Sequence, residues 1–308
     1  MRAMALTEYG GPEVMRLTDL PDPLLGPDSV LVRVRAVGVN PVDTKIRAGY
    51  LAGAFPSAFP LVPGWDVAGV VESTGPAVTE FSAGDDVVGY VRKDHIQHGT
   101  YAELVAAPIR TLAPKPASAS FIEAAGLPLT GLTAHQALDA ATVGAGDTVL
   151  VHAAAGGVGT MAVQLARLRG AKVVGTASEA NHEFLRELGA EPVTYGEGIR
   201  TRLGTVAPAG VDAVIDFVGG EALKLSFGLV ADPARVVSIV DAATVLGNGG
   251  RYVFVRPDAV MLTELSRLVE AGVLRVVVAD SYPLDRAADA HSRVEAGHVR
   301  GKIVLEVD

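Results

Sequence analysis

A glycine-rich run is the part of this 308-residue chain whose residue types and spacing most clearly indicate chemistry. Residues 153–159 read AAAGGVG, between a strand-like run and a run with helical spacing. In a G-x-G-x-x-G turn the second glycine lets backbone N–H groups approach a pyrophosphate, and the third lets the helix pack closely on the strand. Those positions are Gly156 and Gly159, and the first is Ala154. The run predicts dinucleotide binding, with an ordinary tight strand-to-helix turn as the alternative.

The end of the next predicted strand, residues 172–176, bears on which nucleotide would bind. An acidic residue about 20 positions beyond the glycine run would hydrogen-bond the ribose hydroxyls and repel a 2′-phosphate. This chain instead has the small hydroxyl side chains of Thr176 and Ser178, with Glu179 next in sequence. Such hydroxyl groups can accommodate a phosphate, so we predict NADPH as the cofactor.

Metal-binding chemistry has little support in the sequence. The chain has no cysteine, which excludes disulfides, iron–sulfur clusters and thiolate zinc sites. His95 and His98 have the spacing of a ligand pair, but Lys93 and Gly99 indicate a loop and no third ligand stands nearby. We therefore expect no metal site.

The composition indicates a folded protein with two domains. Hydrophobic residues make up 49% and charged residues 20%, which is far from the composition of disordered chains. The net charge of −9 argues against a general nucleic-acid-binding surface. Two uncharged stretches, 48–65 and 148–166, contain helix breakers or polar residues, so we expect buried structure there and no membrane span. Because Glu8 precedes any apolar signal region, we expect a cytoplasmic protein.

The first third of the chain has the pattern of a β domain. Apolar residues alternate with Arg33 and Arg35 over residues 30–37, and short β-branched runs follow at 66–72 and 86–91. Glycine and proline turn signals separate these runs. Several short strands with this punctuation are typical of a compact, barrel-like domain.

From about residue 120, strand-like and helix-like runs alternate, which favours a parallel sheet covered on both faces. The strands are expected at 148–153, 172–176, 212–216, 235–239 and 252–255. The tail shows a helix at 261–271 and strands at 275–278 and 302–305. No linker is visible, which suits a tail that rejoins the first domain. We predict an α/β protein with domains at 1–117, 118–262 and 263–308, the last segment returning to the first domain.

Several motifs extend almost from end to end of the chain. They are GVNPVD (38–43), PGWDVAGVVE (63–72), FSAGDDV (81–87), GTYAE (99–103), LPLTGLTA (127–134), the glycine run, LGA (188–190) and GKIVL (301–305). Taken together, they resemble the zinc-free quinone oxidoreductase (zeta-crystallin-like) branch of the medium-chain dehydrogenase/reductase superfamily.

The resemblance implies a GroES-like barrel domain and a Rossmann domain, with a homodimer formed edge to edge through the Rossmann sheets. Zinc-dependent relatives carry Gly-His-Glu where this chain has Gly64, Trp65 and Asp66, and they have a cysteine ligand and a four-cysteine lobe. Without a Lewis acid, alcohol dehydrogenation lacks its main electrostatic help. Hydride transfer to a quinone or to the β-carbon of an enone is easier, because hydrogen-bond donors can stabilise the charge that develops on oxygen.

The resemblance also implies candidate catalytic residues. Asn40 and Thr130 should line the nicotinamide end of the site, although the Asn40 amide could only hold its loop. Asp43 is expected to cap the helix-like turn of residues 44–48, with orientation of a neighbouring donor as the alternative. Lys45 replaces a tyrosine of some relatives, and it is either a cation near a developing enolate or a solvated surface residue. Tyr50 is either a proton donor to a substrate oxygen or a packed aromatic residue.

The cofactor is expected to contact the glycine run and the ends of the later strands. Tyr195 should stack on the adenine ribose, and Lys302 either reaches the cofactor or pairs locally. The full predicted set is Asn40, Thr130, Ala155, Gly156, Gly157, Val158, Thr176, Ser178, Tyr195, Phe217, Val218, Ile239, Phe254, Val255 and Lys302.

The sequence therefore predicts an NADPH-dependent oxidoreductase that transfers hydride directly to a quinone or an α,β-unsaturated carbonyl compound, without zinc or flavin. A tyrosine, a lysine or water would supply the proton. Departures at Lys45 and Leu51 leave open a pathway-specific enoyl reductase or a non-redox cyclase. A non-catalytic structural protein that binds NADPH is also open, because a fold does not fix a function.

Overall fold

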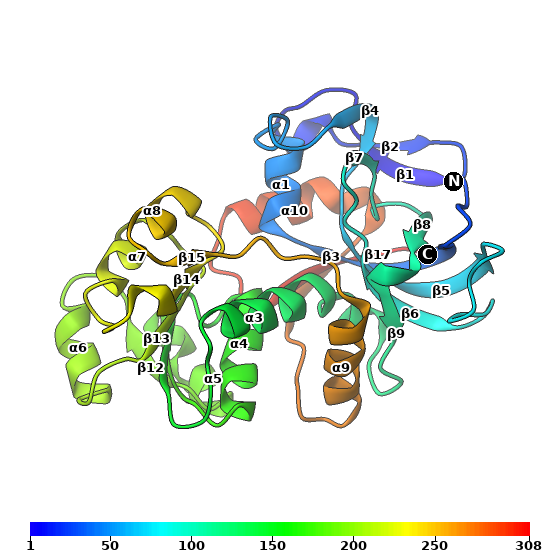
Figure 1. Cartoon of the computed structure of the whole chain (residues 1–308). Helices are drawn as coiled ribbons and strands as arrows, with labels where there is room; N and C mark the ends of the chain where they lie inside the picture. Colours follow the sequence, from blue (N-terminus) through cyan, green and yellow to red (C-terminus); the bar gives the residue numbers. More distant parts are fainter. The chain divides into compact units, whose positions relative to one another are not determined.

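Figure 1 shows the computed structural model of the protein, which describes all 308 residues. The chain divides into two compact units. Unit 1 comprises Met1–Leu129 and Arg256–Asp308, and unit 2 comprises Thr130–Val255. The end of the chain therefore belongs to the same unit as its beginning.

Strands occur in both units. They are β1 (Arg2–Ala5), β2 (Arg16–Asp19), β3 (Ser29–Val39), β4 (Ser57–Val62), β5 (Asp66–Thr74), β6 (Asp86–Tyr90), β7 (Ile96–His98), β8 (Leu104–Pro108), β9 (Leu112–Pro114), β10 (Thr148–Val151), β11 (Lys172–Ala177), β12 (Glu191–Thr194), β13 (Ala213–Asp216), β14 (Val236–Ser238), β15 (Arg251–Tyr252), β16 (Val278–Pro283) and β17 (Lys302–Glu306).

Helices are concentrated in the second half of the chain. They are α1 (Pro41–Arg47), α2 (Phe121–Ala125), α3 (Pro128–Ala140), α4 (Gly157–Leu168), α5 (His182–Glu187), α6 (Ile199–Val206), α7 (Gly220–Ser226), α8 (Ala242–Gly247), α9 (Ala259–Glu270) and α10 (Ala287–Glu295). Short 3₁₀ turns lie at Pro12–Val14, Ile109–Thr111, Glu179–Asn181, Pro233–Arg235 and Leu284–Arg286. None of these helices is both long and apolar enough to cross a membrane.

The borders between the units lie at 129/130 and 255/256, where the sequence predicted 117/118 and 262/263. Local packing explains both differences. Helix α2 packs against β3, β5 and β17, and α9 packs against β9, so both helices belong to unit 1. The Ser266 hydroxyl on α9 also donates a hydrogen bond to the Pro114 carbonyl, at 2.5 Å.

Unit 2 is built on a six-stranded sheet in the order β12-β11-β10-β13-β14-β15. All five pairings are parallel, and helices alternate with the strands along the chain. The predicted doubly wound sheet is present. The predicted strand at 252–255 is mostly wrong, because β15 ends at Tyr252. Beyond it, the Val253 N–H still donates to the Ser238 carbonyl of β14, at 3.0 Å.

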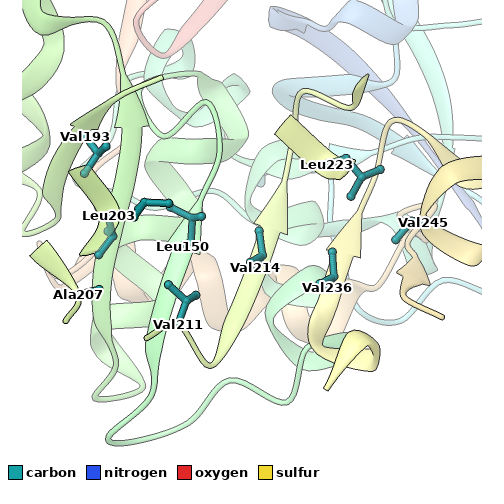
Figure 2. Close-up of a cluster of buried hydrophobic side chains, with 10 residues drawn as sticks. Leu150, Val193, Leu203, Ala207, Val211, Val214, Leu223, Val236 and Val245 are labelled. Carbon is teal, nitrogen blue, oxygen red and sulfur yellow. The ribbon is translucent and has the colours of Figure 1, made fainter. Parts of the chain in front are cut away.

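Buried apolar side chains hold this sheet to its helices. Leu150, Val214 and Val236 lie on the adjacent strands β10, β13 and β14, and each is fully buried (Figure 2). Parallel strands covered in this way are apolar at nearly every position, which explains the continuous apolar runs in the sequence. The rest of the cluster is Val174, Val193, Leu203, Ala207, Val211, Leu223 and Val245.

Unit 1 contains a seven-stranded sheet in the order β16-β17-β3-β5-β6-β9, with β8 also paired to β3. The alternation predicted for residues 30–37 is confirmed on β3, where Val30, Val32, Val34 and Ala36 are buried while the arginines between them are exposed. The last strand, β17, pairs with β3 and β16. Two smaller two-stranded sheets, β1-β2 and β4-β7, complete the strand pairing.

Two predictions for unit 1 are wrong. The strand expected at 275–278 begins only at Val278, because the preceding Val276 is buried in a loop, close to Gly126, and forms no strand. The stretch 48–65 is not buried throughout, since most of its residues before Leu61 are exposed. At 275–277 the apolar residues lie in a loop, and in the stretch 48–65 they include β4, whose first four residues are not buried.

Replacing Leu150 with alanine should lower the free energy of unfolding by about 2–5 kcal/mol, because it leaves a cavity in the unit 2 core. The matched control is Leu246→Ala on α8, at a position that is 59% exposed. That change should cost within about 0.5 kcal/mol. Urea unfolding followed by circular dichroism measures both, and equal losses would contradict the assignment of Leu150 to the core.

Candidate functional site

The glycine run lies where the sequence placed it, between β10 and α4, and Gly156 is the N-cap of that helix. A Cβ at Gly159 would lie 2.2 Å from the Ala153 carbonyl oxygen, so only glycine allows the helix to approach the turn this closely. A Cβ at Gly156 would lie 3.4 Å from the same oxygen and would meet no other atom within 4 Å, so the turn is open at this position. The first N–H groups of α4 have no acceptor within the helix, so this opening suits a pyrophosphate.

Alanine is accommodated at the first position of the run by a glycine on the neighbouring strand. Ala154 is fully buried, and a Cβ at Gly175 of β11 would lie only 2.8 Å from the Ala154 Cβ. The preceding residue, Ala153, has φ of +53°, in the left-handed region that L-residues rarely adopt. The turn is therefore a strained backbone that its surroundings must hold in place.

Thr176 and His152 supply that support. The Ala153 N–H donates to the Thr176 hydroxyl oxygen at 3.2 Å, and the Ala154 N–H donates to the Thr176 carbonyl at 3.0 Å. Nδ1 of the buried His152 lies 3.2 Å from the same hydroxyl, and Nε2 lies 3.1 Å from the Ser226 hydroxyl. Because Ser226 donates its own proton to the Ala222 carbonyl, Nε2 carries the hydrogen of this pair. Burial lowers the pKa of His152, which favours this neutral form.

The structure thus gives the Thr176 side chain a role within the turn, and its contact with the cofactor stays a prediction. The residue is 2% exposed, and its hydroxyl contacts the Ala153 N–H and His152. Ser178, beyond the end of β11, is half-buried, and its hydroxyl accepts a hydrogen bond from Asn181. Ser178 is therefore the remaining hydroxyl of the predicted pair.

A buried carboxylate organises the loops that follow β13 and β14. Asp216, at the end of β13, accepts hydrogen bonds from the Val218 and Gly219 N–H groups and from the Ser238 hydroxyl, at 2.7–3.1 Å. The Ser238 oxygen in turn accepts from the Val240 and Asp241 N–H groups. One acid therefore fixes both loops, which carry the predicted cofactor residues Phe217, Val218 and Ile239.

The predicted cofactor residues of unit 2 gather at one edge of its sheet. The glycine run, Ser178, Tyr195, Phe217 and Ile239 each follow a different strand of the parallel set, and the carboxyl ends of such strands meet at one edge. Tyr195 is half-exposed, at 51%, as are Val218 and Phe254, while Val255 is buried. Sheet topology alone therefore explains why residues spread over a hundred positions form one candidate site.

In unit 1, Asn40 is buried and its amide is fully engaged. The amide Nδ2 donates to Asp66 Oδ2 at 2.9 Å and to the Gly38 carbonyl at 3.2 Å, and Oδ1 accepts from the Lys302 ammonium at 2.5 Å. The backbone N–H of Asn40 donates to Asp43 Oδ2 at 2.8 Å. These contacts fit the loop-holding role that the sequence left open, and a contact of Asn40 with the nicotinamide stays a prediction.

Lys302 likewise pairs locally. Its buried ammonium donates to the Val39 carbonyl at 2.8 Å and to Asn40, and it lies 3.6 Å from Asp66 Oδ2. Asp66 also accepts from the Leu129 N–H at 2.8 Å. Burial raises the pKa of Asp66 and lowers that of Lys302, while their attraction opposes both shifts. The alternative that Lys302 reaches the cofactor has no support in these contacts.

The remaining candidates surround helix α1 and the start of α3. Lys45 is exposed on α1, as the surface alternative predicted. Tyr50 is 81% exposed, which contradicts the packed-aromatic alternative and leaves its hydroxyl accessible. Asp43 is not the N-cap, because α1 begins at Pro41 and its N-cap is Asn40; Asp43 lies in the first turn and accepts a hydrogen bond from the Asn40 N–H. Thr130 is buried in the first turn of α3.

Sequence reasoning missed the buried polar residues that hold these groups. They are Arg47, Asp66, Tyr101, His152, Asp216, Ser226, Ser238 and His291. Asp66 and Asp216 gave one usable signal, since each is an acid next to an apolar run, at the start of β5 and at the end of β13. The partners of the others are distant in sequence, so no local pattern marks them.

Two family models match the chain. One, described as an alcohol dehydrogenase GroES-like domain, covers residues 26–117, and the other, described as a zinc-binding dehydrogenase, covers residues 188–305. The chain is 35% identical over 330 residues to a quinone oxidoreductase of Mus musculus, covering 99% of this chain and 97% of the relative. It is 37% identical over 317 residues to an NADPH-dependent alkenal/one oxidoreductase, chloroplastic, of Arabidopsis thaliana, covering 99% and 79%.

Solved structures agree with these relatives. The chain is similar to the structure of the quinone oxidoreductase from Coxiella burnetii, with a TM-score of 0.90 and 36% identity over 100% of this chain and 99% of that one. The matches confirm the resemblance inferred from the motifs. They also confirm the predicted fold class, a GroES-like domain with a Rossmann-like parallel sheet.

The zinc that the second description implies does not fit the residues present. No three His, Asp or Glu side chains of the 308 residues are placed to hold a metal ion, and the chain has no cysteine. At 64–66, where zinc-dependent relatives carry Gly-His-Glu, Trp65 is buried with its ring centroid 6.3 Å from that of Phe55 and 6.0 Å from that of Tyr90. Aromatic packing occupies this position.

Replacing Asp216 with asparagine should lower the free energy of unfolding by about 1–3 kcal/mol, because its new NH₂ group cannot accept the buried hydrogen bonds of both loops. It should also weaken binding of a nicotinamide nucleotide, measured by calorimetry. The control is Glu221→Gln on α7, a carboxylate that is 90% exposed, which should change neither quantity. Wild-type stability and affinity in the Asp216 variant would show that the loops do not depend on this acid.

Proposed function

Because the chain belongs to the quinone oxidoreductase (zeta-crystallin-like) branch of the medium-chain dehydrogenase/reductase superfamily, we propose that it transfers hydride from NADPH directly to a quinone or an α,β-unsaturated carbonyl compound, without zinc or flavin. It is an oxidoreductase with an NAD(P)-binding fold. The observation that carries the proposal is the open glycine run at the start of α4, in a chain whose relatives are named for reducing quinones and alkenals.

The proposed cofactor site uses the carboxyl edge of the unit 2 sheet. NADPH, when bound, supplies the hydride. The N–H groups at the start of α4 bind the pyrophosphate, Ser178 receives the 2′-phosphate, and Tyr195 packs on the adenine ribose. The other proposed contacts are Ala155, Gly156, Gly157, Val158, Phe217, Val218, Ile239, Phe254 and Val255, together with Asn40 and Thr130 toward the nicotinamide.

A conjugated acceptor matches the polar groups that the chain provides. Hydride addition to a quinone or to an enone β-carbon spreads negative charge onto an oxygen, which hydrogen-bond donors can stabilise. Tyr50 and Lys45 have accessible polar ends and are the proposed proton donors, with water as the third source. Both amide protons of Asn40 are engaged, so we assign this residue to shaping the site and not to proton transfer.

We include the homodimer implied by the resemblance in the proposal. Strand β15 lies at the end of the unit 2 sheet and pairs only with β14, so its other edge can receive a strand from a second copy.

The function is tested by following the loss of NADPH absorbance with panels of quinones and enones. Oxidation of NADPH by simple members of either panel supports the proposal. Turnover of one elaborate enone alone would favour a pathway-specific enoyl reductase, and binding of NADPH without oxidation by any acceptor would favour a structural role. If calorimetry detects binding of neither NADPH nor NADH, the proposal is wrong.

The choice of NADPH is tested by placing an acid at the end of β11. Ser178→Asp should repel the 2′-phosphate and accept hydrogen bonds from the ribose hydroxyls, so the ratio of kcat/KM for NADPH to that for NADH should fall about tenfold or more. Ser178→Ala is the control and should lower the ratio less. A ratio unchanged by the aspartate would place the 2′-hydroxyl end of the cofactor away from Ser178.

A further inference from the structure

The buried polar cluster around Asn40 contains more acids than bases. Asp43 and Asp66 are both fully buried, and the ammonium of Lys302 lies 3.6 Å from Asp66. Two carboxylates therefore face one nearby ammonium. Arg47, the next basic residue, is 2.6 Å from Glu295 and is paired with it.

A chain of hydrogen bonds from Arg47 ends at Asp43, and its direction can be deduced. Arg47 can only donate, so Nδ1 of His291, 3.1 Å away, must accept. The hydrogen of the neutral ring then lies on Nε2, which donates to the Tyr101 oxygen at 3.1 Å. Tyr101 donates in turn to Asp43 Oδ2 at 3.3 Å. Burial and the charge of Arg47 lower the pKa of His291 to about 3, in agreement with a neutral ring.

The two oxygens of Asp43 consequently have different surroundings. Oδ2 accepts from Tyr101 and from the Asn40 backbone N–H, whereas Oδ1 is buried without a hydrogen-bond partner. An anionic oxygen left without a donor in the interior is far more costly than a neutral hydroxyl in the same place. This asymmetry favours a proton on Oδ1.

We propose that Asp43 is a positioning residue that carries a proton on Oδ1 up to neutral pH, and that loss of this proton releases Asn40. Ionisation would put a second negative charge beside Asp66 and draw the Lys302 ammonium away from Asn40 Oδ1. The Asn40 amide would then lose one of the contacts that fix it. The link to catalysis rests on the proposed function, whereas the protonation state of Asp43 does not.

The groups that face Asp43 act on its pKa in opposite directions, and the effect of burial is the largest. Burial, and then the charge of Asp66 on β5, raise the pKa of Asp43, while the Asn40 N–H, Lys302 on β17 and Tyr101 lower it, with a result of about 7. On α10, His291 is neutral, and Glu295 is paired with Arg47 of α1. The proton would therefore be lost within the pH range in which enzymes are ordinarily assayed.

Infrared spectra of the nucleotide-free protein test the protonation directly. Between about pH 5 and about pH 9 the wild type should lose the carbonyl band of a buried carboxylic acid, with a midpoint near pH 7. Asp43→Asn should lack this change. Tyr101→Phe removes a donor to the anion and should move the midpoint to higher pH. A wild-type Asp43 that is already ionised at pH 6 would overturn the inference, whatever the activity.

Stability gives a second readout. An unfolded chain releases this proton at about pH 4 and the folded protein at about pH 7, so the folded state binds more protons in between and stability must fall as the pH rises across that window. Asp43→Asn cannot ionise and should show a shallower fall in melting temperature. The control Glu72→Gln removes a carboxylate whose pKa is lowered by Arg33, so it should leave this fall in place. An unchanged slope in the Asp43 variant would contradict the inference.

The positioning role is tested by pH profiles of NADPH oxidation. Wild-type kcat should decline above about pH 7, Asp43→Asn should retain its activity across that range, and Asp43→Ala should lose activity at every pH because the Asn40 N–H loses its acceptor. If kcat declines above about pH 7 equally in the wild type and in Asp43→Asn, Asp43 does not have the proposed positioning role. If Asp43 titrates as expected but no acceptor oxidises NADPH, the proposed function fails and the assignment of the proton stands.

Discussion

The cost of burying charge is the constraint on which the first unit depends. Lys302 and Asp66 are both withdrawn from water, and each would be strongly destabilising without the other and without the hydrogen bonds to Asn40, Val39 and Leu129. These bonds join the last strand, β17, to the start of α1 and the start of α3. A single buried ion pair thus ties the end of the chain to the loop that carries Asn40.

In unit 2, hydrogen bonds from buried polar side chains stabilise the loops, in place of an ion pair. The glycine run includes a strained alanine, and the run is held by Thr176 of β11, by His152 directly after β10 and by Ser226 of α7. Asp216 does the same for the next two loops. The residues that could touch a nucleotide are mostly small or half-exposed, while the residues that place them are polar and buried.

Sequence patterns predicted those parts of the fold that depend on local physics. Alternation over residues 30–37 identified β3, and the AAAGGVG run identified the turn before α4 with the correct role for Gly159. The strand predicted at 275–278 failed because burial of Val276 in a loop gives the same apolar signal as a strand. The bonds of the Thr176 hydroxyl to Ala153 and His152 were not predicted, since composition at a strand end does not reveal which way a hydroxyl points. The cluster around Asn40 could not be predicted from local patterns, because Lys302 lies 262 positions from Asn40 in the sequence.

The return of the tail to unit 1 has a consequence for the order of synthesis on the ribosome. Residues 130–255 form a complete unit that can fold before the final strands have been translated. Until β16 and β17 have been translated, residues 36–39 of β3 have an unpaired edge. Asp66 likewise has no ammonium partner until Lys302 has been added. A nascent chain that stops a few residues before Lys302 therefore contains a complete unit 2 and an incomplete unit 1. Quality-control proteases will recognise the incomplete unit first.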